Sequence, residues 1–301
     1  MSLVALLFAL LCERGLTHLL ELREARWLDA YFDFADRRLG GRTGTVVLAA
    51  AIVLVALPVL PVALVEQALE PHLLGLVHFA FVVLVLLFSF GPRDLKDEVD
   101  DYVHALEHHD RDEVLRRGKE LLESSPGLHG LRAREAVEEA IFIQANNRIF
   151  GVIFWFMLLG AGGAFAYRVS DMLRRRAAFE AARQGLARMR GDLGSALAAI
   201  HGVLAWLPAR IGALTYGLAG SFEDAVGNWR VAVDRASTGL LDRAEDLLAR
   251  VGKGSLQPSL AGVAVDRLDV ETACGAWRIV SRALWIWIAL IAVLVLAGAA
   301  D

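Results

Sequence analysis

Long uncharged stretches alternate with charged ones along the chain, and several of the uncharged stretches are long enough to cross a membrane. A helix needs roughly 20 apolar residues to span a hydrocarbon core of about 30 Å. Thr43–Val65 and Pro71–Pro92 both meet this requirement. Only residues 66–70 separate them, so we expect a hairpin of two spans. Ala283–Ala300 is a third uncharged stretch and predicts a closing span.

Two further apolar stretches carry features that interrupt a simple span. Ile149–Tyr167 contains the small-residue run Gly160–Gly163 (GAGG), which weakens a helix or lets another backbone approach closely. This stretch is either a full span or a broken, re-entrant element. In residues 193–222 the single formal charge is Arg210, two positions after Pro208. An ionisable residue in such a stretch is expected to face protein or water.

The charged segments have the spacing of amphipathic helices. In residues 95–122 the apolar positions recur at helical intervals, and charged residues fill the other face. No alternating pattern typical of strands is present, so the predicted fold is all-α: a polytopic helical membrane protein with helical cytoplasmic segments. The predicted segments are 1–42 (an apolar half-span or re-entrant helix, then an amphipathic helix), 43–92 (two-span hairpin), 93–148 (cytoplasmic helices), 149–222 (membrane-embedded core), 223–282 (cytoplasmic helices) and 283–301 (closing span).

Composition and charge narrow the class of protein. Of the 301 residues 56% are hydrophobic, above the 45–50% that is usual for soluble domains. The formal net charge of −4 gives no basic footprint, so nucleic acid is not expected as a partner. Two cysteines cannot build a disulfide framework. Lys and Arg are absent from the 66–70 turn, which places this turn outside and the basic segments in the cytoplasm. The side of residues 168–190 stays open, because this segment lies outside if both 149–167 and 193–222 cross fully. Its run Arg174–Arg176 either anchors the topology or attracts anionic lipid head groups, and the first interpretation is preferred.

Two sets of charged side chains in or beside apolar stretches are candidate functional residues. Glu13 and Arg14 follow the apolar residues 1–12, and they lie either at membrane depth or at the water interface. Arg210 has no carboxylate nearby in the sequence, so it either binds an anionic ligand group or extends to the interface. No metal site is expected, because charges of alternating sign surround the neighbouring His104 and His108, as on a solvated helix.

A third set of polar side chains flanks the GAGG-containing stretch. Asn147 precedes it, and Tyr167, Arg168 and Asp171 follow it. If the stretch turns back, these two groups meet and can line one polar pocket. If the stretch spans the membrane, about 30 Å separates them. Ordinary interfacial polar residues are the alternative interpretation.

Two blocks resemble the AmpE/CobD/CbiB family of integral membrane proteins. They are GVIFWFMLLGAGGAFAYRVSDML at Gly151–Leu173 and VLAWLPARIGALTYGLAG at Val203–Gly220. The resemblance extends over most of the chain and is sharpest in residues 144–220. It implies a multi-pass protein of the bacterial inner membrane.

Within that family the sequence looks more like the AmpE branch than the cobalamin enzymes. The enzymes carry an ENxxDG-like motif before the FW pair, and here Asn146 and Phe150 stand in place of its Glu and Asp. The AmpE resemblance implies a regulatory or sensory protein that modulates β-lactamase induction linked to cell-wall recycling, acting by binding rather than turnover. The alternative is an ATP-dependent amide-forming enzyme of cobalamin biosynthesis.

The resemblance and the embedded polar residues together define the expected ligands. The partners expected are membrane lipids and a small-molecule or cell-wall-derived ligand, and association of identical copies is left open. The expected ligand-binding residues are Glu13, Arg14, Asn147, Tyr167, Arg168, Asp171 and Arg210. No catalytic residue is assigned, and the sequence does not identify a cofactor.

Overall fold

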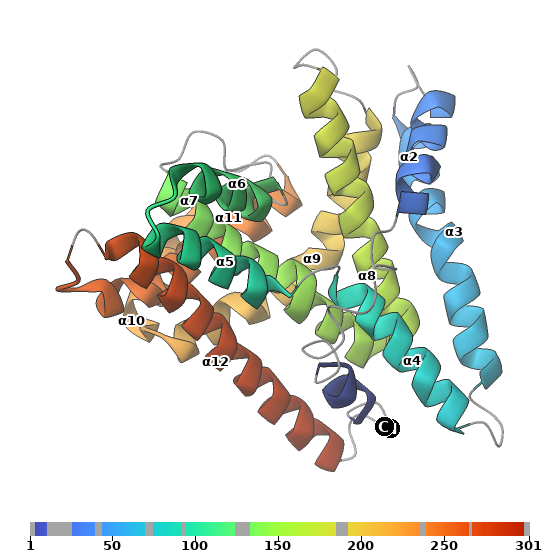
Figure 1. Cartoon of the computed structure of the whole chain (residues 1–301). Coiled ribbons are helices and arrows are strands. Elements are labelled where there is room, and N and C mark those ends of the chain that lie inside the picture. Colours follow the sequence, from blue (N-terminus) through green and yellow to red (C-terminus); the bar gives the residue numbers. More distant parts are fainter. Residues whose placement is uncertain are drawn as a thin grey trace. The chain divides into compact units, whose positions relative to one another are not determined.

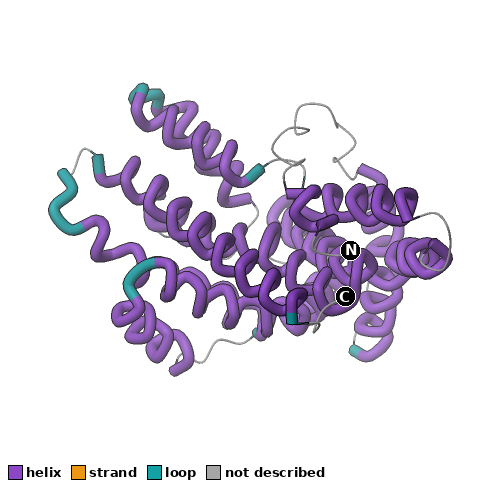
Figure 2. Tube along the Cα trace, turned by 90° about the horizontal axis from the view of Figure 1, so that it is seen from below, coloured by secondary structure: helices purple, strands orange, loops and turns teal. Residues whose placement is uncertain are grey.

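The computed structural model describes residues 4–10, 26–39, 44–69, 75–91, 94–123, 133–184, 192–234, 239–264 and 267–297. Within these ranges every regular element is a helix and none is a strand, which confirms the all-α fold (Figures 1 and 2). Residues 4–10 are helical. The other elements are α2 (Arg26–Leu39), α3 (Thr45–Leu69), α4 (Gly75–Phe90), α5 (Leu95–Glu107), α6 (Arg111–Glu123), α7 (Ala133–Ala145), the π-helical turn η3 (Asn146–Phe150), α8 (Gly151–Gln184), α9 (Asp192–Ala219), α10 (Phe222–Asp234), α11 (Leu240–Leu260) and α12 (Leu268–Leu296).

Five helical stretches are long and apolar enough to cross a membrane, as expected for a multi-pass membrane protein. They include α3 and α9, which correspond to nearly uncharged stretches, and α12, whose uncharged part begins at Ala283. The remaining two, Gly75–Glu107 and Glu135–Ala181, join apolar helices to the polar ones beside them.

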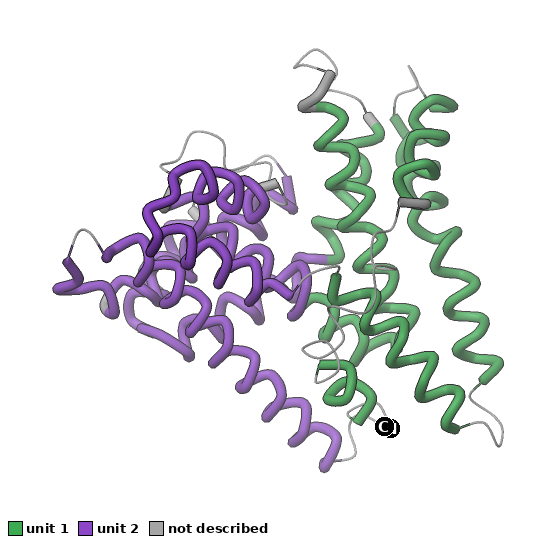
Figure 3. The backbone as a smooth tube through the Cα atoms, in the orientation of Figure 1, with its two compact units in different colours: residues 1–92, 151–204, 300–301 green, residues 93–150, 205–299 purple. Residues whose placement is uncertain are grey.

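The chain forms two compact units, drawn in two colours in Figure 3. Unit 1 comprises Met1–Pro92, Gly151–Leu204 and Ala300–Asp301, and unit 2 comprises Arg93–Phe150 and Ala205–Ala299. In unit 1 the helices α2, α3 and α4 all pack against α8. In unit 2 the helices α7, α11 and α12 pack against one another. An aromatic group lies in the core of unit 2, where the Tyr216 hydroxyl donates to the Phe142 carbonyl oxygen at 2.8 Å.

The GAGG run reverses the direction of α8. Helical geometry fails at Leu159 (φ −133°) and at Gly160, whose φ of 67° and ψ of −159° are accessible in practice only to glycine. In a straight helix, residues 16 positions apart are about 24 Å from each other. Yet a Cβ atom added to Gly151 would overlap the ring of Tyr167. The two arms of α8 therefore lie side by side, which supports the broken, re-entrant alternative over a single full span.

A carboxylate from another helix binds the backbone at the point where α8 reverses. Glu66 of α3 accepts hydrogen bonds from the backbone N–H of Ala161 at 2.7 Å and of Gly162 at 2.9 Å, one on each carboxylate oxygen. The first N–H groups of a helix have no acceptor within the helix. Glu66 thus caps the start of the second arm, residues 160–184.

Candidate functional site

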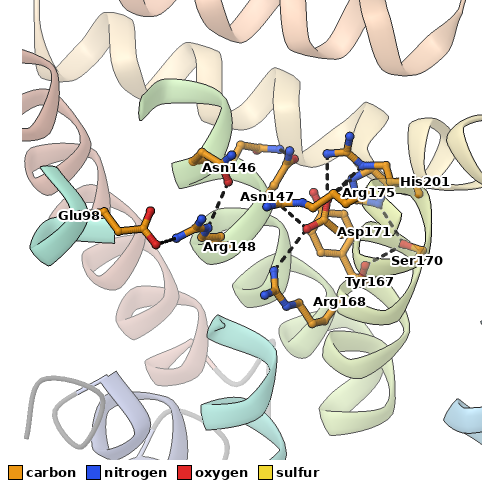
Figure 4. Close-up of polar contacts among 12 residues, drawn as sticks. Glu98, Asn146, Asn147, Arg148, Tyr167, Arg168, Ser170, Asp171, Arg175 and His201 are labelled. Carbon is orange, nitrogen blue, oxygen red and sulfur yellow. Dashed lines mark hydrogen bonds and ion pairs between the residues drawn. The ribbon is translucent and has the colours of Figure 1, made fainter. Parts of the chain in front are cut away.

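The candidate site of unit 1 is built around Asp171, a fully buried carboxylate in the second arm of α8 (Figure 4). One of its oxygens, Oδ1, accepts from Arg174 Nε at 3.0 Å and pairs with Arg174 Nη2 at 2.8 Å. The other, Oδ2, pairs with Arg175 Nη2 at 2.8 Å and accepts from Arg168 Nη1 at 3.3 Å. Three guanidinium groups therefore converge on one carboxylate. Such groups match the geometry of carboxylate and phosphate ligands.

Helical spacing brings these charges together. Residues three and four positions apart are neighbours on a helix surface, so Arg168, Arg174 and Arg175 all reach Asp171. Gly91, the residue after the end of α4, lies beside this cluster and has a φ of 112°. A Cβ atom there would lie 3.0 Å from Arg168 Nη2. Glycine at this position therefore leaves room for the guanidinium.

His201 of α9 reaches the same cluster. Ser170 Oγ donates its single proton to the Tyr167 carbonyl oxygen at 2.7 Å. His201 Nδ1 lies 2.9 Å from the same hydroxyl and is hydrogen-bonded to it. This leaves His201 Nε2 facing Asp171 Oδ1 at 3.7 Å. The His201 ring also packs on the Tyr167 ring, with centroids 4.9 Å apart.

Unit 2 holds a separate buried polar group in and beside the π-helical turn η3 (Figure 4). Arg148 donates to Glu98 Oε1 of α5 at 2.9 Å and to Gln144 Oε1 at 3.1 Å. Asn146 and Asn147 are buried beside it, and their side chains are joined at 3.4 Å. A buried charge pair needs this kind of hydrogen-bonded surrounding, because its removal from water is costly.

Arg210 also belongs to unit 2, where its partners come from its own helix. The guanidinium lies over the Trp206 ring, 4.0 Å from the centroid, and donates to the Trp206 carbonyl oxygen at 3.0 Å. Stacking on an aromatic ring holds an arginine while leaving its edge able to bind an anion.

The structure places the predicted site residues in two groups. Tyr167, Arg168 and Asp171 come together in unit 1, whereas Asn147 and Arg210 belong to unit 2. Glu13 and Arg14 lie outside the described residues.

Sequence reasoning missed other members of the unit 1 cluster. The sequence does not identify His201 or Ser170, and it assigns the arginine run to membrane topology or lipid head groups. In fact Arg174 and Arg175 point to Asp171. The spacing of Arg174 and Arg175, three and four positions after Asp171, is the pattern in the sequence that indicates these contacts. For His201 the only indication in the sequence is its position in an uncharged stretch. Within the described ranges no set of three or more His, Cys, Asp or Glu side chains is arranged to hold a metal ion.

Comparison with known proteins finds a matching family model and relatives with a shared name. A family model described as CobD/Cbib protein matches residues 6–239. The cobalamin biosynthesis protein CobD of Chromobacterium violaceum is 29% identical over 242 residues, covering 75% of this chain and 74% of that protein. The protein of the same name from Stutzerimonas stutzeri is 30% identical over 219 residues, covering 70% and 68%. No solved structure matches.

These findings overturn the expected regulatory function. The AmpE-like role in β-lactamase induction is wrong, because both relatives are named for cobalamin biosynthesis. The expectation depended on carboxylates missing at positions 146 and 150. The structure shows buried carboxylates at other positions, Asp171 and Glu98, so the loss of two acidic positions does not leave the chain without buried acidic groups.

Proposed function

Because the chain belongs to the CobD/CbiB family, we propose that it is an enzyme of cobalamin biosynthesis that forms an amide bond at the expense of ATP. It joins an aminopropanol-type amine to a corrin carboxylate. The observation that carries this proposal is the family match over residues 6–239, which covers both arms of α8 and all of α9.

The Asp171 cluster supports this chemistry. Amide formation from a carboxylate requires activation, and phosphoryl transfer from ATP converts the carboxylate into an acyl phosphate that the amine nitrogen attacks, releasing phosphate. Carboxylate, acyl phosphate and nucleotide are all anions. Arginine side chains bind such groups through paired N–H donors, and Arg168, Arg174 and Arg175 gather three guanidinium groups within one helix segment.

The ligand-binding residues proposed for this reaction are those already singled out by the sequence. In unit 1 they are Tyr167, Arg168 and Asp171, with His201 added by the structure. In unit 2 they are Asn147 and Arg210. Glu13 and Arg14 remain proposed on the sequence alone.

We further propose that the protein lies in the bacterial inner membrane with its basic segments in the cytoplasm. The distribution of Lys and Arg supports this orientation. It gives the arginine-rich end of α8 access to cytoplasmic ATP.

Growth complementation tests the proposed function. A bacterial host that lacks its corrinoid amide synthase is supplied with the incomplete corrinoid and with this gene, and membrane insertion is verified by fractionation. We expect the wild-type chain to restore growth. Absence of growth with the protein present in the membrane would overturn the proposal.

A matched pair of variants locates the site within the same assay. Asp171→Asn removes the charge on which three arginines converge, and we expect it to abolish growth while the protein still inserts. Asp100→Asn, at an exposed ion pair with Lys96, is expected to grow like the wild type. Normal growth of the Asp171→Asn variant would remove this cluster from the site.

A further inference from the structure

Helix α9 contains a proline in its interior, and this leaves one backbone carbonyl without its helical donor. In an α-helix the N–H of residue i donates to the carbonyl of residue i−4. Pro208 has no N–H, so the carbonyl oxygen of Leu204 loses this bond. Stretch 193–219 is apolar enough to lie in a membrane, where an unpaired carbonyl is costly. Some other donor must therefore bind Leu204.

The donor is the indole of Trp155, which comes from the first arm of α8. Its Nε1–H donates to the Leu204 carbonyl oxygen at 3.0 Å, across 49 positions of sequence. Trp155 also lies at the contact between the arms, because a Cβ atom added to Gly163 would overlap the Trp155 carbonyl oxygen. One residue thus takes part both in the reversal of α8 and in the docking of α9.

The second arm of α8 binds α9 as well. His201 lies three residues before Leu204 and is hydrogen-bonded to Ser170, the neighbour of Asp171. Helix α9 is therefore hydrogen-bonded to the first arm at Leu204 and to the second arm at His201. A shift of α9 along either arm would move His201 away from Ser170 and Asp171.

We propose that Trp155 is a positioning residue for the Asp171 cluster, and that it acts through the carbonyl that Pro208 leaves unpaired. The Trp155 indole fixes the register of α9 on the α8 hairpin and so holds His201 against Ser170. The effect on turnover rests on the proposed amide-forming function, whereas the effect on docking of α9 does not.

A proline-dependent rescue distinguishes this role from ordinary packing of a tryptophan. Trp155→Phe keeps an aromatic ring but removes the donor, so the Leu204 carbonyl is left unpaired. Pro208→Ala supplies a backbone N–H that can bind the same carbonyl within α9. The double variant therefore repairs the defect of the single variant. Because an interior proline is destabilising by itself, the diagnostic quantity is the loss that Trp155→Phe causes in each background. If Trp155 acts only by filling space, that loss is equal in the wild-type and Pro208→Ala backgrounds; if the indole replaces the missing N–H, the loss is much smaller in the Pro208→Ala background.

The experiment compares Trp155→Phe, Pro208→Ala and the double variant, with Trp285→Phe as the control. Trp285 is 69% exposed, so its replacement removes an indole without touching the hairpin. Amide formation is measured per amount of folded, purified protein. We expect Trp155→Phe to lower kcat about tenfold, the size of effect that loss of one such bond gives, with a smaller change in KM. We expect the double variant to recover to within about threefold of wild type, and Trp285→Phe to match wild type.

The thermal unfolding midpoint of the same proteins in detergent gives a readout independent of activity. It should fall from wild type to Trp155→Phe, and fall much less from Pro208→Ala to the double variant. An equal loss from Trp155→Phe in the wild-type and Pro208→Ala backgrounds, in both readouts, would overturn the proposal. Recovery of the midpoint without recovery of kcat would show that Trp155 docks α9 but does not position the site. If the wild type forms no amide, the proposed function fails, and the midpoint alone then decides whether Trp155 and Pro208 are coupled.

Discussion

Two membrane helices of this protein, α8 and α9, are interrupted, and the backbone groups left without helical partners are hydrogen-bonded in opposite ways. In α8 the break at Gly160 leaves backbone N–H groups without partners, and the carboxylate of Glu66 accepts from two of them. In α9 the break at Pro208 leaves a carbonyl without a partner, and the indole of Trp155 donates to it. In α8 an anionic side chain accepts from backbone N–H groups, whereas in α9 a neutral side chain donates to a backbone carbonyl.

The consequences for the chain differ as well. A glycine with positive φ allows the backbone of α8 to reverse, so its two arms pack together. Proline removes one hydrogen bond but keeps a helical φ, so α9 continues to Ala219. The glycine break creates the hairpin that carries Asp171, and the proline break provides the place where a third helix attaches to it.

The largest effect is expected at the glycine break. Gly160→Ala forces an unfavourable conformation, which costs about 1–3 kcal/mol, and its Cβ atom would lie 2.5 Å from Glu66 Oε1. The substitution therefore displaces the cap as well as straining the backbone. We expect the thermal unfolding midpoint in detergent to fall by about 5 °C or more. Gly75→Ala is the control, since nothing lies within 4 Å of a Cβ atom there. Equal midpoints for the two variants would contradict the reversal.

Removal of the cap alone should have a smaller effect. Glu66→Ala leaves the N–H groups of Ala161 and Gly162 without their acceptor but leaves Gly160 unstrained. A loss of about 2 kcal/mol is expected, because hydrogen bonds to charged groups are the stronger ones. Gln67→Ala, at the exposed neighbouring position, should leave the midpoint unchanged. A fall in the Gln67 variant that matches the fall in the Glu66 variant would show that α3, and not the cap, is responsible.

The positions of the two helix breaks could be predicted from the sequence, but the side chains that hydrogen-bond the freed backbone groups could not. GAGG and Pro208 are visible as residue types, and their local meaning follows from glycine and proline alone. Glu66 and Trp155 lie 95 and 49 positions away from their partners, and no local pattern marks them. For the same reason the sequence left the full-span and re-entrant alternatives for residues 149–167 open.

In the candidate site, too, contacts between residues far apart in the sequence could not be predicted. Tyr167, Arg168 and Asp171 were found because they follow an apolar stretch directly. His201 was not found, because only the docking of α9 on α8 brings it to Ser170. The prediction of the AmpE branch is wrong because two missing acidic residues in one motif are weaker evidence than similarity over most of the chain. The match over residues 6–239 and the names of both relatives correct that judgement.

The most direct test of the account is the reaction of the purified protein. Wild type and Asp171→Asn, both purified in detergent and shown to be folded, are incubated with ATP, the corrinoid carboxylate and the aminopropanol-type amine. The products are then separated and identified by mass spectrometry. The account predicts ATP-dependent formation of the amide by the wild type and at least about a hundredfold less by Asp171→Asn. Folded wild type that forms no amide, beside an active amide synthase assayed in parallel, would contradict it.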